Sequence, residues 1–258
     1  MKKNEGFITS TTARISEEER NARSDFMDYY LNRNPIPEEE RLDNLALFIK
    51  RRELGRILFM NEIYKKIVEH EIVGAVIEFG CRWGRNLVLF QNLRGLYEPY
   101  MVGRKIIGFD TFSGFPDSIT VKDGCASHMV AGGHSVTPGY EQELDCIMSY
   151  HEKESPISHV KKYELIKGDV TETFPDYMDK HPETLIALAY FDLDLYQPTR
   201  DCLKEIITYM PKGAVIGFDD LTSYGFPGET IAFKELLGAN NYEVHYSKTE
   251  PSCSYVVL

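Results

Sequence analysis

The chain has 258 residues, which suits one α/β domain with an added cap or two small domains. Its formal net charge of −11 argues against a nucleic-acid partner, because contact with the phosphate backbone needs a basic face. Small anionic ligands stay open, since a bound cation or a few local basic side chains can reverse the field at one site.

The cysteines and the hydropathy pattern bear on the location of the protein. Its five cysteines are scattered and form no C-x-x-C or His/Cys ligand pattern, as is typical of a protein in a reducing cytoplasm. The sequence shows no signal peptide and no run of about 18 apolar residues. We therefore expect a cytoplasmic protein that neither enters nor crosses a membrane.

The first quarter of the chain carries only helical signals. Residues 1–15 are polar and are expected to be loose or to become ordered on binding. Ser16 and Glu19 have the spacing of a capping box, which predicts a helix over 17–32. A second helical stretch is expected from Glu38 to about Glu69, with a break at Gly55.

Apolar residues recur at helical spacing along the second stretch, at Leu54, Leu58, Ile63 and Ile67. Residues 1–70 are therefore predicted to form a helical cap. This cap could cover the sheet edge or serve as a dimerisation element, which makes a homodimer plausible.

From residue 71 the pattern becomes α/β. Strands are predicted at 75–79, 105–109, 163–167, 185–193, 214–218, 243–247 and 255–258, with helical segments between most of them. Such alternation predicts a mostly parallel seven-stranded sheet covered on both faces. Only a short polar stretch separates the last two strands, which favours an antiparallel hairpin at the sheet edge.

One connection is unusually long, from Thr111 to Val160, and is rich in glycine. Long glycine-rich loops in compact domains are more often binding loops or lids than passive links. We expect a lid insertion at about 117–140, followed by a helix over 141–151. His128 and His134 lie in it; the simpler interpretation makes both solvated loop histidines, and His134 is also a candidate contact to a substrate.

The stretch AVIEFGCRWGRN at residues 75–86 reads as a buried strand, a glycine turn and the start of a helix. Such a unit offers backbone N–H groups to a nucleoside-type ligand. Arg82 and Trp83 stand where the dinucleotide fingerprint G-x-G-x-x-G has its middle glycine. The turn therefore favours a nucleoside without a pyrophosphate linker.

Ligands of open α/β sheets bind beyond the carboxyl ends of the strands, so residues there are candidates for a site. Asp110 ends the second strand, ahead of Thr111 and Ser113, and is placed to accept hydrogen bonds from ribose hydroxyls. Asp169, which follows the third strand and precedes Val170, could meet the edge of an adenine ring.

Aspartates follow the next two strands. Asp192 and Asp194 lie two apart and so share one face of an extended segment, and Asp219 and Asp220 end the following strand. If these strands are neighbours, the carboxylates converge and repel unless a cation lies among them or some hold protons. Oxygen ligands alone favour Mg²⁺, with Ca²⁺ or Mn²⁺ as alternatives.

A purely structural interpretation of the same aspartates is also open. In it, Asp194 caps a helix that begins near Pro198, and Asp219 or Asp220 caps a turn. The segment 225–230, GFPGET, follows the acidic pair and is either a candidate acceptor site or only a turn before a helix.

Five motifs carry a family resemblance: IEFGCRWGRN (77–86), GFDTFSGFPD (108–117), KGDVTETFP (167–175), FDLDLYQPT (191–199) and VIGFDDLTSYGFPGET (215–230). With them the chain resembles class I S-adenosylmethionine-dependent methyltransferases, which have a Rossmann-like fold. More narrowly, it is similar to the macrocin O-methyltransferase-like family, which includes nucleotide-sugar O-methyltransferases. The resemblance covers about residues 72–258.

The resemblance implies roles for individual residues. Cofactor contacts are expected at Glu78, Gly80, Cys81, Arg82, Gly84, Asn86, Asp110, Thr111, Ser113, Asp169 and Val170. A divalent metal, expected to be Mg²⁺, would be bound by Asp192, Asp219 and Asp220. Asp192 and Asp194 are the catalytic candidates, with Asp194 as the base, and the acceptor is expected to contact Tyr196, Tyr224, Phe226, Glu229 and His134.

The implied function is methylation of a sugar hydroxyl, with a nucleotide-linked sugar of a surface polysaccharide or a natural-product glycoside as the preferred acceptor. A phosphorylated or phosphoramidate-type polysaccharide precursor, a free glycoside and a macrolide are alternatives. Two rivals belong to other classes: a nicotinamide-dependent dehydrogenase, which the missing fingerprint disfavours, and a non-catalytic adenosyl-ligand-binding protein.

Overall fold

The computed structural model describes residues 16–117, 119–124 and 129–258. The expectations for residues 1–15, for His128 and for a few positions of the insertion lie outside these ranges. Contacts divide the chain into two units, Met1–Gly55 and Arg56–Leu258. The role of residues 1–70 as a cap or dimerisation element stays a prediction.

In the first unit the helix predicted over 17–32 is present, but the α-helix predicted from Glu38 begins only at Arg51. Helix α1 (Glu17–Asn32) begins after Ser16, whose side chain accepts a hydrogen bond from the Glu19 N–H at 3.1 Å. Two 3₁₀ turns follow, η2 (Glu38–Glu40) and η3 (Leu45–Phe48).

Helix α2 (Arg51–Glu69) runs through Gly55 without interruption, so the predicted break there is wrong. A single glycine costs a helix only about 1 kcal/mol, which the burial of later turns offsets. The predicted buried face is only half right. Ile63 and Ile67 are fully buried, but Leu54 and Leu58 are almost half exposed, and the buried face instead includes Phe59, Met60 and Tyr64.

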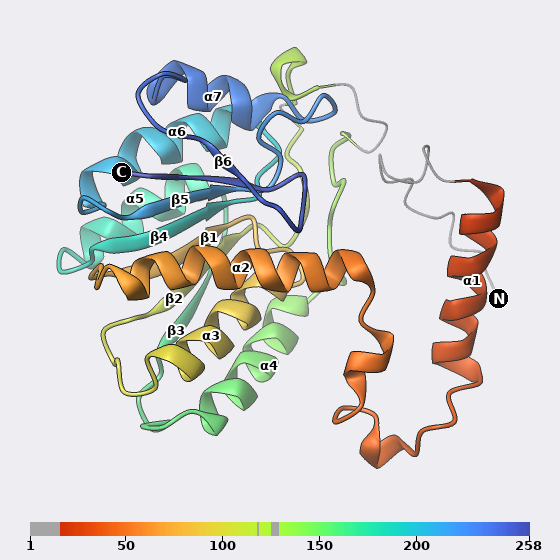
Figure 1. Ribbon diagram of the computed structural model, residues 1–258. Coiled ribbons are helices and arrows are strands. Elements are labelled where there is room, and N and C mark those ends of the chain that lie inside the picture. Colours follow the sequence, from red (N-terminus) through yellow and green to blue (C-terminus); the bar gives the residue numbers. More distant parts are fainter. Residues whose placement is uncertain (1–15, 118, 125–128) are drawn as a thin grey trace. The chain divides into compact units, whose positions relative to one another are not determined.

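The second unit is built on one seven-stranded sheet in the order β3-β2-β1-β4-β5-β7-β6 (Figure 1). The strands are β1 (Ala75–Phe79), β2 (Ile106–Asp110), β3 (Tyr163–Lys167), β4 (Ile186–Phe191), β5 (Val215–Phe218), β6 (His245–Tyr246) and β7 (Ser254–Val257). The first five are parallel, and β7 is antiparallel to β5 and to β6. The predicted mostly parallel sheet with a final hairpin is confirmed.

Helices cover both faces of the sheet (Figure 1). One apolar core joins the sheet to α5 (Val170–Lys180), α6 (Tyr196–Ile206) and α7 (Gly228–Leu236). The other joins it to the later turns of α2, to α3 (Arg85–Tyr97) and to α4 (Tyr140–Glu154). The chain reverses its direction of strand addition between β1 and β4, where such sheets bind ligands.

We predict that Gly80→Ala destabilises the fold. Gly80 has φ of +85°, and an added Cβ would lie 2.1 Å from the Asp192 carbonyl oxygen. A strained backbone and a clash with main chain should lower the free energy of unfolding in urea by about 2–3 kcal/mol. Gly103→Ala is the control, since a Cβ there meets nothing within 4 Å. Equal stability of the two variants would contradict the conclusion that position 80 requires glycine.

Candidate active site

Two buried side chains, one from β1 and one from the first turn of α3, flank the glycine turn between them. Glu78 and Asn86 are both buried, and the Asn86 amide Nδ2 donates to Glu78 Oε1 at 2.7 Å. Within the described ranges, Glu78 Oε2 and Asn86 Oδ1 have no hydrogen-bond partner. Burial raises the pKa of Glu78 to about 8. These atoms form an unfilled acceptor site for a donor such as an amine.

Three residues of the turn fix its conformation through burial, a backbone hydrogen bond and a close packing contact. Cys81 is buried, and burial raises the pKa of its thiol. Arg82 has φ of +46°, and its N–H donates to Asp110 Oδ2 at 2.7 Å. Gly84 begins α3 with φ of +73°, and a Cβ there would lie 2.3 Å from Leu144. The turn is therefore fixed against the end of β2.

The end of β2 is organised by backbone donors. Asp110 Oδ1 accepts from the Phe112 N–H at 2.5 Å, so both of its oxygens already hold one hydrogen bond. Thr111 Oγ1 donates to the Gly114 carbonyl at 3.1 Å and accepts from the Ser113 N–H at 3.2 Å. Each carboxylate oxygen of Asp110 keeps a lone pair for a further donor.

Asp169 and Val170 lie where α5 begins. Asp169 caps the helix, with Oδ1 accepting from the Thr171 N–H at 2.9 Å, and its side chain is exposed. Val170 is buried. The cap leaves the second carboxylate oxygen of Asp169 available to a ligand at the end of β3.

The four aspartates come together, as expected from the topology. Strands β4 and β5 are parallel neighbours, with Phe191 opposite Phe218, so Asp192 and Asp194 emerge beside Asp219 and Asp220. Burial and the charges of Asp219 and Asp194 raise the pKa of Asp192 well above its usual range. Burial and the same two charges raise the pKa of Asp220 to about 8. The carboxylates repel one another in a poorly hydrated site.

A buried arginine compensates one of the four charges. The Arg56 guanidinium of α2, only 2% exposed, donates to Asp219 Oδ1, and the Tyr190 hydroxyl donates to the same oxygen at 2.7 Å. The Cys253 thiol lies 3.5 Å from it. Burial alone would raise the pKa of Asp219, but the Arg56 charge and these hydrogen bonds bring it below its usual range.

The sequence interpretation missed Arg56. A signal was available, because Arg56 shares the buried face of α2 with Phe59, Met60 and Ile63 at helical spacing. A charged residue on an apolar helix face requires a buried partner. Nothing in the sequence identified that partner, which is 163 positions away.

The helix-cap interpretation of Asp194 is wrong. Helix α6 begins at Tyr196, and the side chain that accepts from the Tyr196 N–H is Asp123 of the insertion, at 2.6 Å. Asp194 is instead 6% exposed with φ of +60°, and its hydrogen bond with Asp220 contributes to the raised pKa of that residue. Its Oδ2 lies 3.3 Å from His134 Nδ1.

The expected acceptor contacts are unevenly placed. Tyr196 and Phe226 are buried, and the Tyr196 hydroxyl donates to Glu235 at 2.6 Å. Glu229 is fully buried, and its Oε2 accepts from the Asp220 N–H at 3.2 Å. Tyr224 is 90% exposed, and His134 is half-buried rather than a solvated loop histidine. Glu229 thus holds the backbone of Asp220 through this hydrogen bond.

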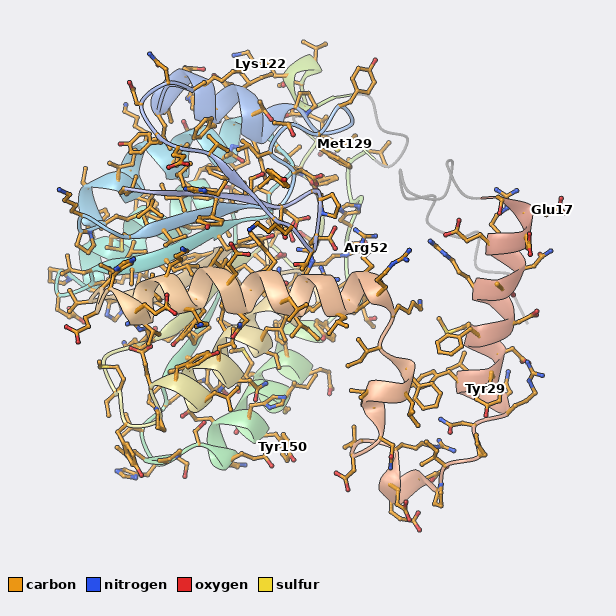
Figure 2. All side chains as sticks on the ribbon, in the orientation of Figure 1. Glu17, Tyr29, Arg52, Lys122, Met129 and Tyr150 are labelled. Atoms are coloured by element: carbon orange, nitrogen blue, oxygen red, sulfur yellow. The ribbon has the colours of Figure 1, made fainter. Side chains whose placement is uncertain are left out.

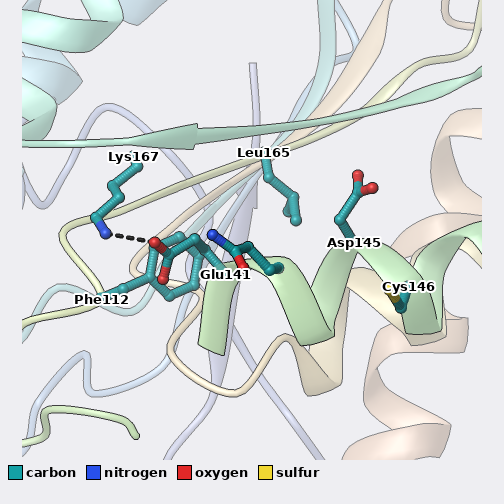
Figure 3. A pocket seen from close by; sticks show the side chains of 7 residues that line it. Phe112, Glu141, Asp145, Cys146, Leu165 and Lys167 are labelled. Atoms are coloured by element: carbon teal, nitrogen blue, oxygen red, sulfur yellow. Dashed lines mark hydrogen bonds and ion pairs between the residues drawn. The ribbon is translucent and has the colours of Figure 1, made fainter. Parts of the chain in front are cut away.

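A separate hollow of about 420 Å³ lies between β3 and α4 (Figure 3). Its lining includes Phe112, Leu165, Asp145 and the ion pair of Lys167 with Glu141. None of the four aspartates lines it. Phe112 alone connects it to the Asp110 turn.

The expected metal site is not shown. Across residues 16–117, 119–124 and 129–258, no three His, Cys, Asp or Glu side chains are arranged to hold a metal ion. Coordination by Asp192, Asp219 and Asp220 stays a prediction. In the same ranges, no helix is both long enough and apolar enough to span a membrane.

Comparison with known proteins places the chain in a family. Residues 49–237 match the family model described as macrocin-O-methyltransferase (TylF). No curated protein sequence matches the chain.

Two solved structures are similar over nearly their full length. One, "CalS11, Calicheamicin Methyltransferase", is 38% identical with a TM-score of 0.90, and 98% of each chain is covered. The other, "CalS11, TDP-rhamnose 3'-o-methyltransferase, an enzyme in Calicheamicin biosynthesis", is 36% identical with a TM-score of 0.82, covering 96% of this chain and 99% of that one. The O-methyltransferase NovP, 16% identical over 79% of each chain with a TM-score of 0.58, shares the fold.

The family match covers well over half of the chain, and both faces of its sheet are built as the class I methyltransferase fold requires. The dehydrogenase alternative is thereby set aside. The chain belongs to the macrocin O-methyltransferase family and is an S-adenosylmethionine-dependent O-methyltransferase.

Proposed function

We propose that this enzyme methylates a hydroxyl of a nucleotide-linked sugar, with a TDP-deoxysugar as the preferred acceptor, in the biosynthesis of a natural-product glycoside or a surface polysaccharide. The observation that carries the proposal is the gathering of Asp192, Asp194, Asp219 and Asp220 at the ends of β4 and β5. Its acceptor class is supported by the 36% identity to a protein described as a TDP-rhamnose 3'-O-methyltransferase.

The residues of the β1 turn fit the cofactor. The unpartnered oxygens of Glu78 and Asn86 are acceptors, as the amino group of S-adenosylmethionine requires, and a cation there would favour the ionised form of Glu78. Asp110 would bind the ribose hydroxyls, and Asp169 with Val170 would flank the adenine. When bound, S-adenosylmethionine supplies an electrophilic methyl group on sulfur.

The acidic residues fit a hard divalent cation in their chemistry. Every donor is a carboxylate oxygen, and the like charges that raise the pKa of Asp192 and Asp220 would be relieved by a cation. Asp192, Asp219 and Asp220 would hold it. A bound Mg²⁺ lowers the pKa of a hydroxyl and helps to orient it.

The chain's own groups then do the remaining work. Asp194 would accept the proton of the acceptor hydroxyl, and the cofactor would supply the methyl group and leave as S-adenosylhomocysteine. Orientation of the two reactants contributes up to about 7–11 kcal/mol in favourable cases. The apolar cluster of Met129, Leu195 and Phe226 lies next to Asp194 and helps to exclude water.

Methyl transfer to a panel of acceptors tests the proposal. Enzyme, labelled S-adenosylmethionine and Mg²⁺ are incubated with TDP-rhamnose, other nucleotide sugars, free rhamnose and a macrolide, and products are identified by mass spectrometry. We expect transfer to a TDP-sugar, and Asp192→Asn should slow it by a factor on the order of 10² or more. If only a free glycoside or the macrolide becomes labelled, that compound class is the acceptor and the nucleotide-sugar proposal is wrong. If no acceptor becomes labelled, a non-catalytic ligand-binding protein is favoured.

Removing the guanidinium partner of Asp219 should destabilise the enzyme. Arg56→Met leaves a buried carboxylate without its compensating charge, so unfolding should become easier by about 3–5 kcal/mol in chemical denaturation. Lys180→Met is the matched control, because it breaks an ion pair in which both side chains are more than 60% exposed. A similar decrease in the free energy of unfolding in the two variants would show that the buried ion pair stabilises the fold no more than the exposed one.

A further inference from the structure

The insertion after β2 is anchored at its neck. The Phe115 N–H donates to the Gly133 carbonyl at 2.9 Å, and the Gly132 N–H donates to the Phe115 carbonyl at 2.9 Å. A Cβ on Gly114 would lie 2.4 Å from the Gly133 carbonyl oxygen, so the two sides of the neck are in close contact. The backbone just before His134 is therefore held in place.

The insertion contacts three consecutive residues, the last two of the loop between β4 and α6 and the first residue of α6. His134 Nδ1 lies 3.3 Å from Asp194 Oδ2, and Met129 packs with Leu195 and Phe226. Asp123 Oδ1 accepts from the Tyr196 N–H at 2.6 Å. Figure 2 shows Met129 and Lys122, the neighbour of Asp123, on the same side of the second unit as α7.

The segment that these contacts reach lacks a local side-chain cap at the start of α6. Asp194 has φ of +60° and His134 has φ of +62°, an uncommon backbone conformation outside glycine that Asp and His adopt more readily than most residues. Helix α6 has no side-chain cap of its own at Leu195, and Asp123 supplies one from the insertion. Asp123 is 2% exposed, and its Oδ2 also accepts from the Thr120 N–H at 2.6 Å.

The geometry points to His134 as a positioning residue for Asp194: its imidazole Nδ1 holds the carboxylate from the insertion side, so that the insertion builds the proton-accepting site rather than only covering it. The inference rests on the proposed function, in which Asp194 accepts the hydroxyl proton. The ring of His134 is itself held, with its centroid 5.0 Å from that of Phe115. Asp123 fixes the chain two residues further along, at the Tyr196 N–H.

The test is the steady-state kinetics of His134→Ala with the acceptor on which the wild type is active. Misplacement of a reacting group by about 1 Å costs on the order of 10²-fold, so we expect a loss of that order in kcat. The KM for S-adenosylmethionine and the calorimetric affinity for S-adenosylhomocysteine should stay within about twofold, because the cofactor turn is a separate element. His134→Gln keeps a side-chain donor and should recover most of kcat.

A double-mutant cycle separates positioning from a general structural role. In an Asp194→Asn background, His134→Ala should have almost no further effect, because its target has already been removed. Val121→Ala, on the insertion but 97% exposed, is the control that should behave as wild type.

Three results would overturn the inference: wild-type kcat in His134→Ala, an equal loss in the Asp194→Asn background, or no recovery in His134→Gln. In each of these the wild type remains active, so the proposed function survives. An inactive wild type on every acceptor refutes the proposed function and the positioning role together.

Discussion

Repulsion among four carboxylates is the constraint on which this enzyme depends. Parallel pairing of β4 and β5 brings Asp192 and Asp194 against Asp219 and Asp220, and burial makes each charge costly. Arg56 of α2 compensates the charge of Asp219 through a direct hydrogen bond. Among the residues that the structure describes, Asp192 and Asp220 have no such compensating cation, and their pKa values are raised.

The surrounding elements serve this arrangement. Glu229 accepts the Asp220 N–H at the start of α7, and an added Cβ on Gly228 would lie 2.7 Å from the Asp194 carbonyl oxygen. Helix α7 can therefore approach the acidic loop closely only because residue 228 is glycine. On the other side, the glycine turn after β1 places Glu78 and Asn86 at the adjacent strand end. The proposed cofactor and acceptor regions thus both lie where the strand order reverses, at the ends of the neighbouring strands β1 and β4.

Much of the fold could be predicted because its signals are local. Short, largely apolar runs identified the five parallel strands, and the polar stretch before the last strand indicated the hairpin. Helix α2 was harder, because Leu54 and Leu58 fit a helical repeat as well as the residues that are buried. Their exposure depends on how the helix lies on the sheet, which no local pattern records.

The site was predictable to the extent that strand ends define it. The convergence of the aspartates follows from strand order, but the side chains that contact them come from distant segments: Arg56 of α2 and Cys253 before β7 contact Asp219, and His134 of the insertion contacts Asp194. The sequence placed Asp194 equally well as a helix cap. Only the tertiary contact of Asp123 with the Tyr196 N–H resolves that choice.

Binding of Mn²⁺ by the purified enzyme tests the central claim most directly, since the free ion and the bound ion differ in their paramagnetic resonance signal. If the carboxylates at the ends of β4 and β5 gather a cation, the wild type should bind one Mn²⁺ per chain. A variant with Asp219→Asn and Asp220→Asn should bind none, and Mg²⁺ should displace the ion. Equal binding by the two proteins, or none by either, would contradict the claim.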